Sequence, residues 1–191
     1  MDDMTRTQYF TATSIDGFIA DPDNSLDWLM ALRQSEEGQQ EYPAFIAEVG
    51  AIAMGSTTYQ WVLDHENLLE KPEGWPYEQP TWVFTSRDLP TVPGADIRFV
   101  CGDVAPVHTQ MIEAAAGKNV WLVGGGELVG QFADVGLLDE IILGVGSVLL
   151  GGGAPLLPRR LTPPRLRLIS ATPDGDDFVT LRYAVGPPAS G

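Results

Sequence analysis

A run of three glycines between a strand-like and a helix-like segment has the clearest chemical meaning in this chain. Residues 120–123 are apolar and strand-forming, glycines occupy 124–126, and residues 128–135 repeat apolar side chains at helical spacing. Glycines let a ligand approach the backbone closely, and a helix start offers unpaired N–H groups with about half a positive charge. The pattern therefore predicts a site for a phosphate or pyrophosphate group.

Two familiar phosphate-binding motifs do not match these glycines. The dinucleotide motif G-x-G-x-x-G requires a third glycine where Val129 stands, and no Gly-Lys-Ser/Thr follows for a P-loop. The glycines can equally form a tight strand-to-helix turn that binds nothing. The residues of this segment leave both interpretations open.

The charge balance restricts the partners that the chain can have. Its 191 residues include 26 acidic and 11 basic side chains, a formal net charge of −15. Nucleic acids and anionic membranes bind basic surfaces, so we expect neither as a partner. The sequence has no run of about 18 apolar residues, which a membrane span would need, and its first ten residues lack the features of a signal peptide. The sequence therefore predicts a cytoplasmic protein that holds any anionic ligand with local amides, hydroxyls and a few arginines.

Strand-like and helix-like segments alternate along the chain. We expect strands at 9–19, 51–54, 81–85, 97–101, 120–123 and 139–145, and a closing hairpin at 166–171 and 178–184. We expect helices over 36–49, from Ser56 as N-cap, over 107–116 and after the triple glycine. This order predicts one α/β domain over residues 1–185, with a mixed, mainly parallel sheet flanked by helices and an antiparallel pair at its end. Residues 186–191 are expected to form a disordered tail.

Three segments of the chain resemble the dihydrofolate reductase-like superfamily. They are SIDGFIADPDNSLDWL at 14–29, AMGSTTYQ at 53–60, and VWLVGGGELVGQF with the following GLLDEIILGVGSVLLGGGAPLL at 120–157. The chain most resembles the branch that contains the reductase domain of the riboflavin-biosynthesis deaminase-reductase. The resemblance spans residues 7–185 and implies one dihydrofolate reductase-like α/β domain, NADPH as hydride donor and a homodimer.

The same resemblance implies cofactor-binding roles for three segments. The implied residues are Gly55, Ser56, Thr57 and Thr58; Thr85, Ser86 and Arg87; and Gly124, Gly125, Gly126, Glu127 and Leu128. The last group would hold the pyrophosphate, through its glycines and the amides of Glu127 and Leu128. Dihydrofolate reductases usually carry basic residues in the first of these segments, where this chain has hydroxyls. Arg87 is therefore the candidate for pairing with the extra phosphate of NADPH, unless it is an ordinary exposed arginine.

The substrate side of the resemblance implies one catalytic acid after the first loop, and Asp27 beside Trp28 is the candidate. A carboxyl group in an apolar pocket can act as an acid near neutral pH. Asp27 can equally be the N-cap of the next helix. Asp16, in the S-x-D-G turn, is expected to close that turn. No cluster of His, Cys and Asp has the spacing of a metal site, so we expect no metal.

The function implied by the resemblance is an NADPH-dependent reductase that transfers a hydride to a small acceptor. The acceptor would be a heterocycle or imine, either pterin-like or ribosylamino-pyrimidine-like. A ribose phosphate on it would need basic residues, and the spare ones are Arg33, Arg159 and Arg160. The alternative is a nucleotide-binding module of the same fold without turnover, because a fold does not fix a function.

Overall fold

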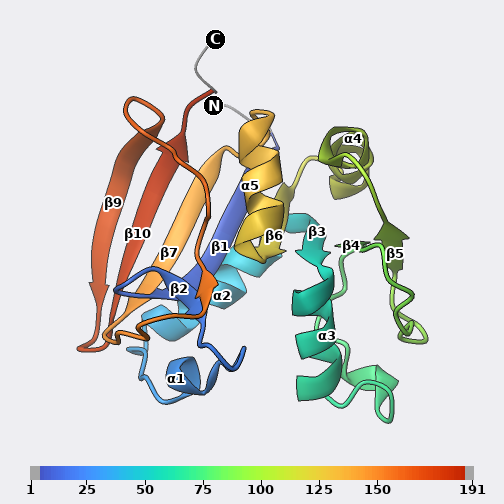
Figure 1. Cartoon of the computed structure of the whole chain (residues 1–191), viewed down its shortest axis with the longest axis horizontal. Helices are drawn as coiled ribbons and strands as arrows, with labels where there is room; N and C mark the ends of the chain where they lie inside the picture. The colour runs from blue at the N-terminus through green and yellow to red at the C-terminus, as the bar shows by residue number, and fades with distance from the viewer. Residues whose placement is uncertain (1–4, 188–191) are drawn as a thin grey trace.

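Eight strands pair into one twisted sheet in the computed structural model, which describes residues 5–187 (Figure 1). The strand order is β5-β4-β3-β6-β1-β7-β10-β9. The strands are β1 (Thr7–Ser14), β3 (Val49–Gly55), β4 (Thr81–Phe84), β5 (Ile97–Val100), β6 (Asn119–Gly124), β7 (Glu140–Gly146), β9 (Leu166–Asp174) and β10 (Phe178–Val185). The first six strands of this order, from β5 through β4, β3, β6 and β1 to β7, pair in parallel with their neighbours. Strand β10 is antiparallel to β7, and β9 is antiparallel to β10. The expected sheet and closing hairpin are confirmed.

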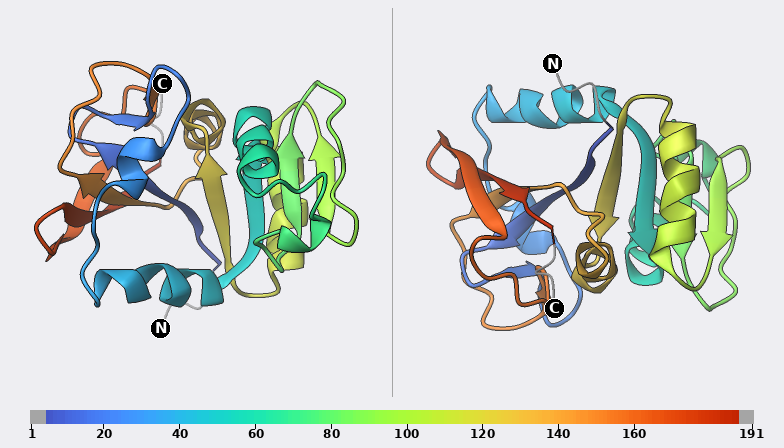
Figure 2. Two further views of the ribbon diagram at one scale, coloured as in Figure 1. Left: turned by 90° about the horizontal axis from the view of Figure 1, so that it is seen from below. Right: turned by 90° about the horizontal axis from the view of Figure 1, so that it is seen from above.

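Helices cover both faces of this sheet. They are α2 (Gly38–Ala47), α3 (Ser56–His65), α4 (Val104–Ala115) and α5 (Gly126–Asp134), with the short α1 (Asp27–Met30) and the 3-10 helix η1 (Pro72–Gly74). Apolar side chains of α4 and α5 pack into one core, and those of α2 and α3 into a second core on the opposite face. Figure 2 shows α2 and α5 on opposite sides of β1. None of the helices within residues 5–187 is long and apolar enough to span a bilayer.

The central strands read as continuous apolar runs because both of their faces are covered. Ile52, Ala53 and Met54 of β3 are fully buried, as are Val120 and Leu122 of β6. Such runs are typical of parallel strands between two helical layers. A second, two-stranded sheet pairs β2 (Phe18–Ala20) with β8 (Ala154–Pro155), and its β2 strand contacts β1.

The structure corrects several expected boundaries. The first strand divides into β1 and β2 because the chain turns at Gly17, whose φ of 84° is a conformation that glycine adopts readily. Helix α4 begins at Val104, three residues before the expected start. Ser56 as N-cap was wrong: β3 continues to Gly55, which has extended backbone angles and occupies the N-cap position itself. Of the tail expected to be disordered, residues 188–191 lie outside the described part of the chain.

Candidate active site

Two helix N-termini open at the same edge of the sheet. Strands β3 and β6 are parallel neighbours, with Ala53 opposite Leu122 and Met54 opposite Gly124. Each leads directly into a helix whose N-cap is a glycine, Gly55 for α3 and Gly125 for α5, and neither helix has a side-chain cap. The N–H groups in the first turn of both helices are therefore available to a ligand. Because parallel strands end at a common edge, the positive ends of two helix dipoles converge there.

A cavity of about 380 Å³, here called the glycine cavity, lies between these two helix starts. Its lining residues are Gly55, Ser56, Thr57, Phe84, Thr85, Ser86, Cys101, Gly102, Gly125, Glu127, Leu128 and Gln131. The structure thus brings together residues from all three segments for which the sequence implied cofactor binding. Thr58 and Gly126 instead line a second cavity that adjoins the glycine cavity. Gly124 is the last residue of β6, and Arg87 borders a separate cavity.

The three glycines of the turn differ in what the structure requires at each position. Gly124 has a φ of +142°, which L side chains rarely adopt. A Cβ at Gly126 would lie 2.5 Å from the carbonyl oxygens of Pro155 and Leu156, so only glycine fits this close approach. A Cβ at Gly125 would have no atom within 4 Å. The backbone at Gly125 therefore faces the open cavity, where a ligand can approach it.

A carboxylate at the start of α5 is held by an arginine from a distant segment. Glu127 accepts hydrogen bonds from Arg159 at 2.7 and 2.9 Å, and Arg159 also donates to Asp134 at 2.8 Å. The bonds from Arg159 lower the pKa of the Glu127 carboxyl group, although the pair is exposed to solvent. The guanidinium thus offsets a negative charge that would otherwise oppose an anion at this helix start.

The glycine cavity continues into a second cavity of about 510 Å³, the central cavity. The two share Thr57, Gly125 and Glu127 among their lining residues. The side walls of the central cavity are mostly apolar and aromatic: Ile19, Leu26, Trp61, Val62, Tyr77, Trp121 and Val123. Burial raises the pKa of Tyr77, so its hydroxyl keeps its proton in the neutral pH range. The central cavity suits a flat ring, which aromatic walls can contact face to face or at their edges.

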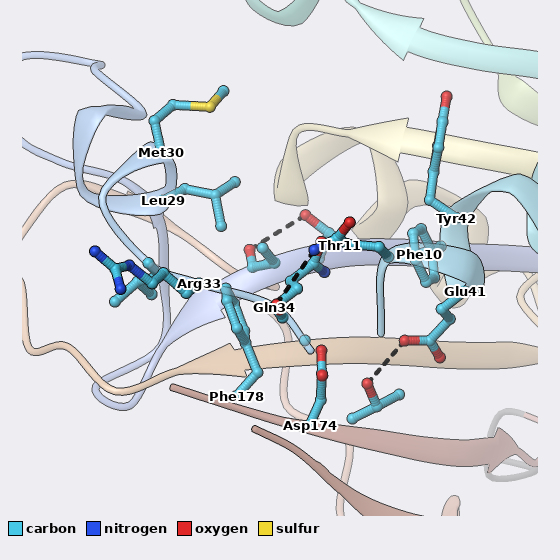
Figure 3. Close-up of a pocket in the computed structure, with 15 residues that line it drawn as sticks. Phe10, Thr11, Leu29, Met30, Arg33, Gln34, Glu41, Tyr42, Asp174 and Phe178 are labelled. Atoms are coloured by element: carbon cyan, nitrogen blue, oxygen red, sulfur yellow. Dashed lines mark hydrogen bonds between the residues drawn. The ribbon is translucent and has the colours of Figure 1, made fainter. Parts of the chain in front are cut away.

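A third cavity of about 620 Å³, the outer cavity, adjoins the central one through Phe10, Thr11, Ala12 and Leu29 (Figure 3). Two carboxylates line it. Glu41 of α2 accepts a hydrogen bond from Thr180 Oγ1 at 2.9 Å. Asp174 accepts one from the backbone N of Ser35 at 2.8 Å and a second from the hydroxyl of the same serine.

Asp27 lies outside these cavities. It is the exposed first residue of α1, its backbone N donates to Ser25 Oγ at 3.0 Å, and it is absent from the lining of each cavity described above. Its alternative role as N-cap was wrong, because Leu26 occupies that position and no side chain caps the helix. The structure therefore gives the catalytic role of Asp27 no support, and that role stays a prediction.

Asp16 closes its turn, as the sequence indicated. Its carboxylate accepts hydrogen bonds from Ser14 Oγ at 2.6 Å and from the backbone N of Leu150 and Gly151 at 3.1 and 2.7 Å. These bonds, that from Ser14 first, lower the pKa of Asp16. Asp16 thus fixes the loop after β7 against the loop after β1.

Arg87 is exposed and borders a side cavity of about 480 Å³. Thr57 and Trp61 also line this side cavity, together with His65, whose ring stacks on Trp61 at a centroid distance of 4.4 Å. Thr57 is common to the side, central and glycine cavities. Among residues 5–187 the Arg87 guanidinium has no hydrogen-bond or ion-pair partner, which leaves it free to pair with a ligand.

Sequence reasoning missed Glu41. A signal for it exists, because Glu41 stands four residues before Phe45 and so shares the apolar face of the helix expected at 36–49. An acidic residue on a helix face that packs against a sheet is unusual unless it is bonded or functional. The hydroxyl of Thr180 that holds it lies 139 residues away in sequence, which no local pattern reveals.

Comparison with known proteins identifies the family. Residues 60–180 match the family model described as the RibD C-terminal domain. The chain belongs to this family. A relative from Bacillus subtilis strain 168, the uncharacterized protein YwjB, is 32% identical over 179 residues, which cover 93% of this chain and 97% of the relative. Reductases of the family act on pyrimidines and use NAD(P)H.

Solved structures show the same fold. A candidate riboflavin biosynthesis protein from Shewanella sp. PV-4 has a TM-score of 0.79 at 24% identity, over 95% of this chain and 99% of that chain. The Thermotoga maritima diaminohydroxyphosphoribosylaminopyrimidine deaminase/5-amino-6-(5-phosphoribosylamino)uracil reductase gives 0.63 at 14% identity, over 96% of this chain and 57% of that one. Dihydrofolate reductase from Enterococcus faecalis gives 0.60 at 11%, over 95% and 96%. The resemblance inferred from the sequence motifs is thus confirmed at the level of family and fold.

The open space at Gly125 generates a first test. Gly125→Val should place a branched side chain where a ligand would contact the backbone, and overfilling of a packed contact costs about 1–3 kcal/mol. We expect NADPH to bind about tenfold more weakly or worse, measured by calorimetric titration. Gly186→Val is the matched control, because its Cβ would meet only ordinary contacts of 3.6 Å and more away from the cavities. Equal affinities for the parent and Gly125→Val would remove NADPH from this site.

Proposed function

We propose that this protein is an NADPH-dependent reductase that transfers a hydride to a small heterocyclic or imine-type acceptor. The observation that carries the proposal is the convergence of two uncapped helix N-termini on one cavity, which continues into an aromatic cavity and then into one lined by two carboxylates. Each volume lies within the usual range for ligand sites, about 300–1,000 Å³. In this order the three cavities would hold the pyrophosphate, the nicotinamide ring and the acceptor.

The residues present fit a nicotinamide dinucleotide. Backbone N–H groups at the starts of α3 and α5 would hold the pyrophosphate, with Ser56, Thr57 and Ser86 hydroxyls beside the adenosine half. The aromatic walls of the central cavity would contact the nicotinamide ring and exclude water from it. When bound, the dinucleotide would supply the hydride, and the residues of the central cavity would orient its ring toward the outer cavity.

Glu41 is the side chain of the outer cavity best placed to assist proton transfer. Thr180 fixes one of its oxygens, Oε2, while Oε1 makes no hydrogen bond within residues 5–187. A carboxyl group held in this way can hydrogen-bond to an acceptor nitrogen and share a proton with it as charge develops. Thr180 would act as the positioning residue, because it fixes the orientation of the carboxyl group.

Two matched substitutions compare this assignment with the acid implied by the sequence. Glu41→Gln keeps the shape of the side chain but removes the proton-sharing group, so turnover should fall roughly 10²–10⁴-fold while NADPH affinity stays unchanged. Asp27→Asn should keep turnover within about twofold of the parent, since Asp27 is exposed outside the cavities. Both are measured by NADPH oxidation against a panel of pterins, pyrimidines and imines.

The opposite pattern, a large loss in Asp27→Asn and none in Glu41→Gln, would restore the sequence-based assignment. Intact NADPH binding with no oxidation across the panel would favour the alternative, a nucleotide-binding module without turnover.

Arg87 gives the proposed preference for NADPH over NADH its physical basis. It is the cation nearest in sequence to Thr85 and Ser86 of the glycine cavity, and its guanidinium has no partner among the described residues. A hydrogen bond to a charged group contributes roughly 1.5–3 kcal/mol, so Arg87→Ala should reduce the ratio of affinities about tenfold or more. Arg6→Ala, an exposed arginine that lines none of the four cavities, is the control. An unchanged ratio in Arg87→Ala would show that another group reads the phosphate.

We also propose that the protein forms a homodimer through β9. This edge strand has nine residues of which only Asp174 is buried, and it exposes Leu166, Leu168 and Ile169 by 39–52%. A long apolar edge strand favours pairing with another chain. At micromolar concentration the parent should sediment at twice its 20.6 kDa mass, and Leu168→Glu should shift it to monomer. Leu69→Glu, at an exposed leucine outside β9, should not. A monomeric parent would contradict the proposal.

A further inference from the structure

The outer and central cavities are poor in positive charge. The charged residues that line them are Glu41, Asp174, Glu127 and Arg33, three carboxylates and one guanidinium. Arg33 is exposed, and Figure 3 shows its guanidinium pointing away from Thr11 and Glu41. The groups that face the interior of the outer cavity are therefore negative or neutral.

The other arginines that could have served an anionic group are engaged or remote. Arg159 is held by Glu127 and Asp134, because all three nitrogens of its guanidinium donate hydrogen bonds to these two carboxylates. Arg160 is exposed and lines none of the four cavities described above. The net charge of −15 adds an unfavourable field for any anion that lacks local donors.

Hydrogen-bond acceptors outnumber charged donors on the outer cavity wall. Oε1 of Glu41 makes no hydrogen bond within residues 5–187, whereas its Oε2 accepts from Thr180. Asp174 is buried, with Oδ1 bonded to Ser35 and Oδ2 packed against Gly38, so it contributes negative charge to this wall. The rest of the wall includes Phe10, Tyr42 and Phe178, which offer ring surfaces. Such a wall favours a flat ligand that donates hydrogen bonds and disfavours one that carries negative charge.

We infer that the acceptor of this reductase is a neutral or cationic heterocycle with no phosphate or carboxylate tail. The inference rests on the proposed function, because it concerns the acceptor side of the same site. On this inference, neither the phosphorylated ribosylamino-pyrimidine nor the glutamyl tail of a folate binds well to this cavity. Glu41 and Asp174 are the residues that make this selection.

Two pairs of compounds that differ in anionic groups test the inference. One pair is 5-amino-6-(ribosylamino)uracil and its 5-phosphate; the other is 6-methyl-dihydropterin and dihydrofolate. Each is titrated calorimetrically into the protein saturated with NADP⁺, which has no hydride to give, so that binding is read without turnover. The member without the anionic group should bind about tenfold more tightly or better in each pair. The preference should shrink as salt is added.

Charge reversal assigns the effect to the cavity. Glu41→Lys should improve binding of the 5-phosphate about tenfold relative to its unphosphorylated partner. Glu48→Lys makes the same charge change at the exposed C-terminal end of the same helix, outside the cavity lining, and should leave the ratio unchanged.

Each outcome has a defined meaning. Equal or tighter binding of the phosphorylated or glutamylated compound by the parent overturns the inference, and so does failure of all four compounds to bind. If the parent protein does not bind NADP⁺ when the cofactor is titrated in before the acceptors, that result instead contradicts the proposed function. In that case the acceptor pairs are titrated into the free protein, where the same preference is expected and its absence overturns the inference.

Discussion

The parallel pairing of β3 with β6 is the constraint on which the rest of the site depends. The register sets Met54 beside Gly124, so the two strands end within one residue of each other and their following helices start side by side. A shift of this register by even one or two residues would separate the two helix N-termini and move Thr57 away from Gly125. Buried apolar residues along both strands, such as Ile52 and Leu122, hold the register because a slip of one residue would move each of them into the core on the opposite face, where its volume and shape would not fit the packing.

The same arrangement explains how a strongly acidic chain can present an anion site. The chain-wide field is negative, but N–H groups and helix dipoles act within a few ångströms, where they outweigh distant charges that salt screens. Glu127 would weaken this local positive region, and Arg159 offsets it. No such compensation exists at the outer cavity, where Glu41 and Asp174 face a wall without an inward cation among the described residues. The two ends of the site therefore differ in charge preference.

The sequence predicted the parts of the site that are local in the chain. The strand, the glycine turn and the helix at 120–135 follow from periodicity and from glycine chemistry within a few residues of one another, and the structure has them. The mainly parallel sheet followed from the alternation of elements. Family resemblance then identified the three segments that meet at the glycine cavity, which spacing could not have brought together.

The acceptor side could not be predicted in the same way because its contacts are long-range. Glu41 reaches the site because α2 crosses to β10, and Asp174 because the β9–β10 hairpin returns to Ser35. Asp27 was chosen by its place after a polar loop, but this stretch turns outward into α1 and leaves the carboxylate exposed. Ser56 was chosen as a cap by residue type, although the extended backbone of Gly55 fills that position. Packing between distant segments placed Glu41 and Asp174, whereas the local backbone decided the cap at Gly55.

The central claim is that the amides at the starts of α3 and α5 bind the pyrophosphate of a nicotinamide dinucleotide. Nuclear magnetic resonance of the ¹⁵N-labelled protein during titration with NADPH observes these amides directly, and a 20.6 kDa chain suits the method. The account predicts that the largest shifts fall on Ser56, Thr57, Gly126, Glu127 and Leu128, with smaller ones along the central cavity. A spectrum in which these amides stay in place at saturating NADPH, or in which the shifts concentrate elsewhere, would contradict it.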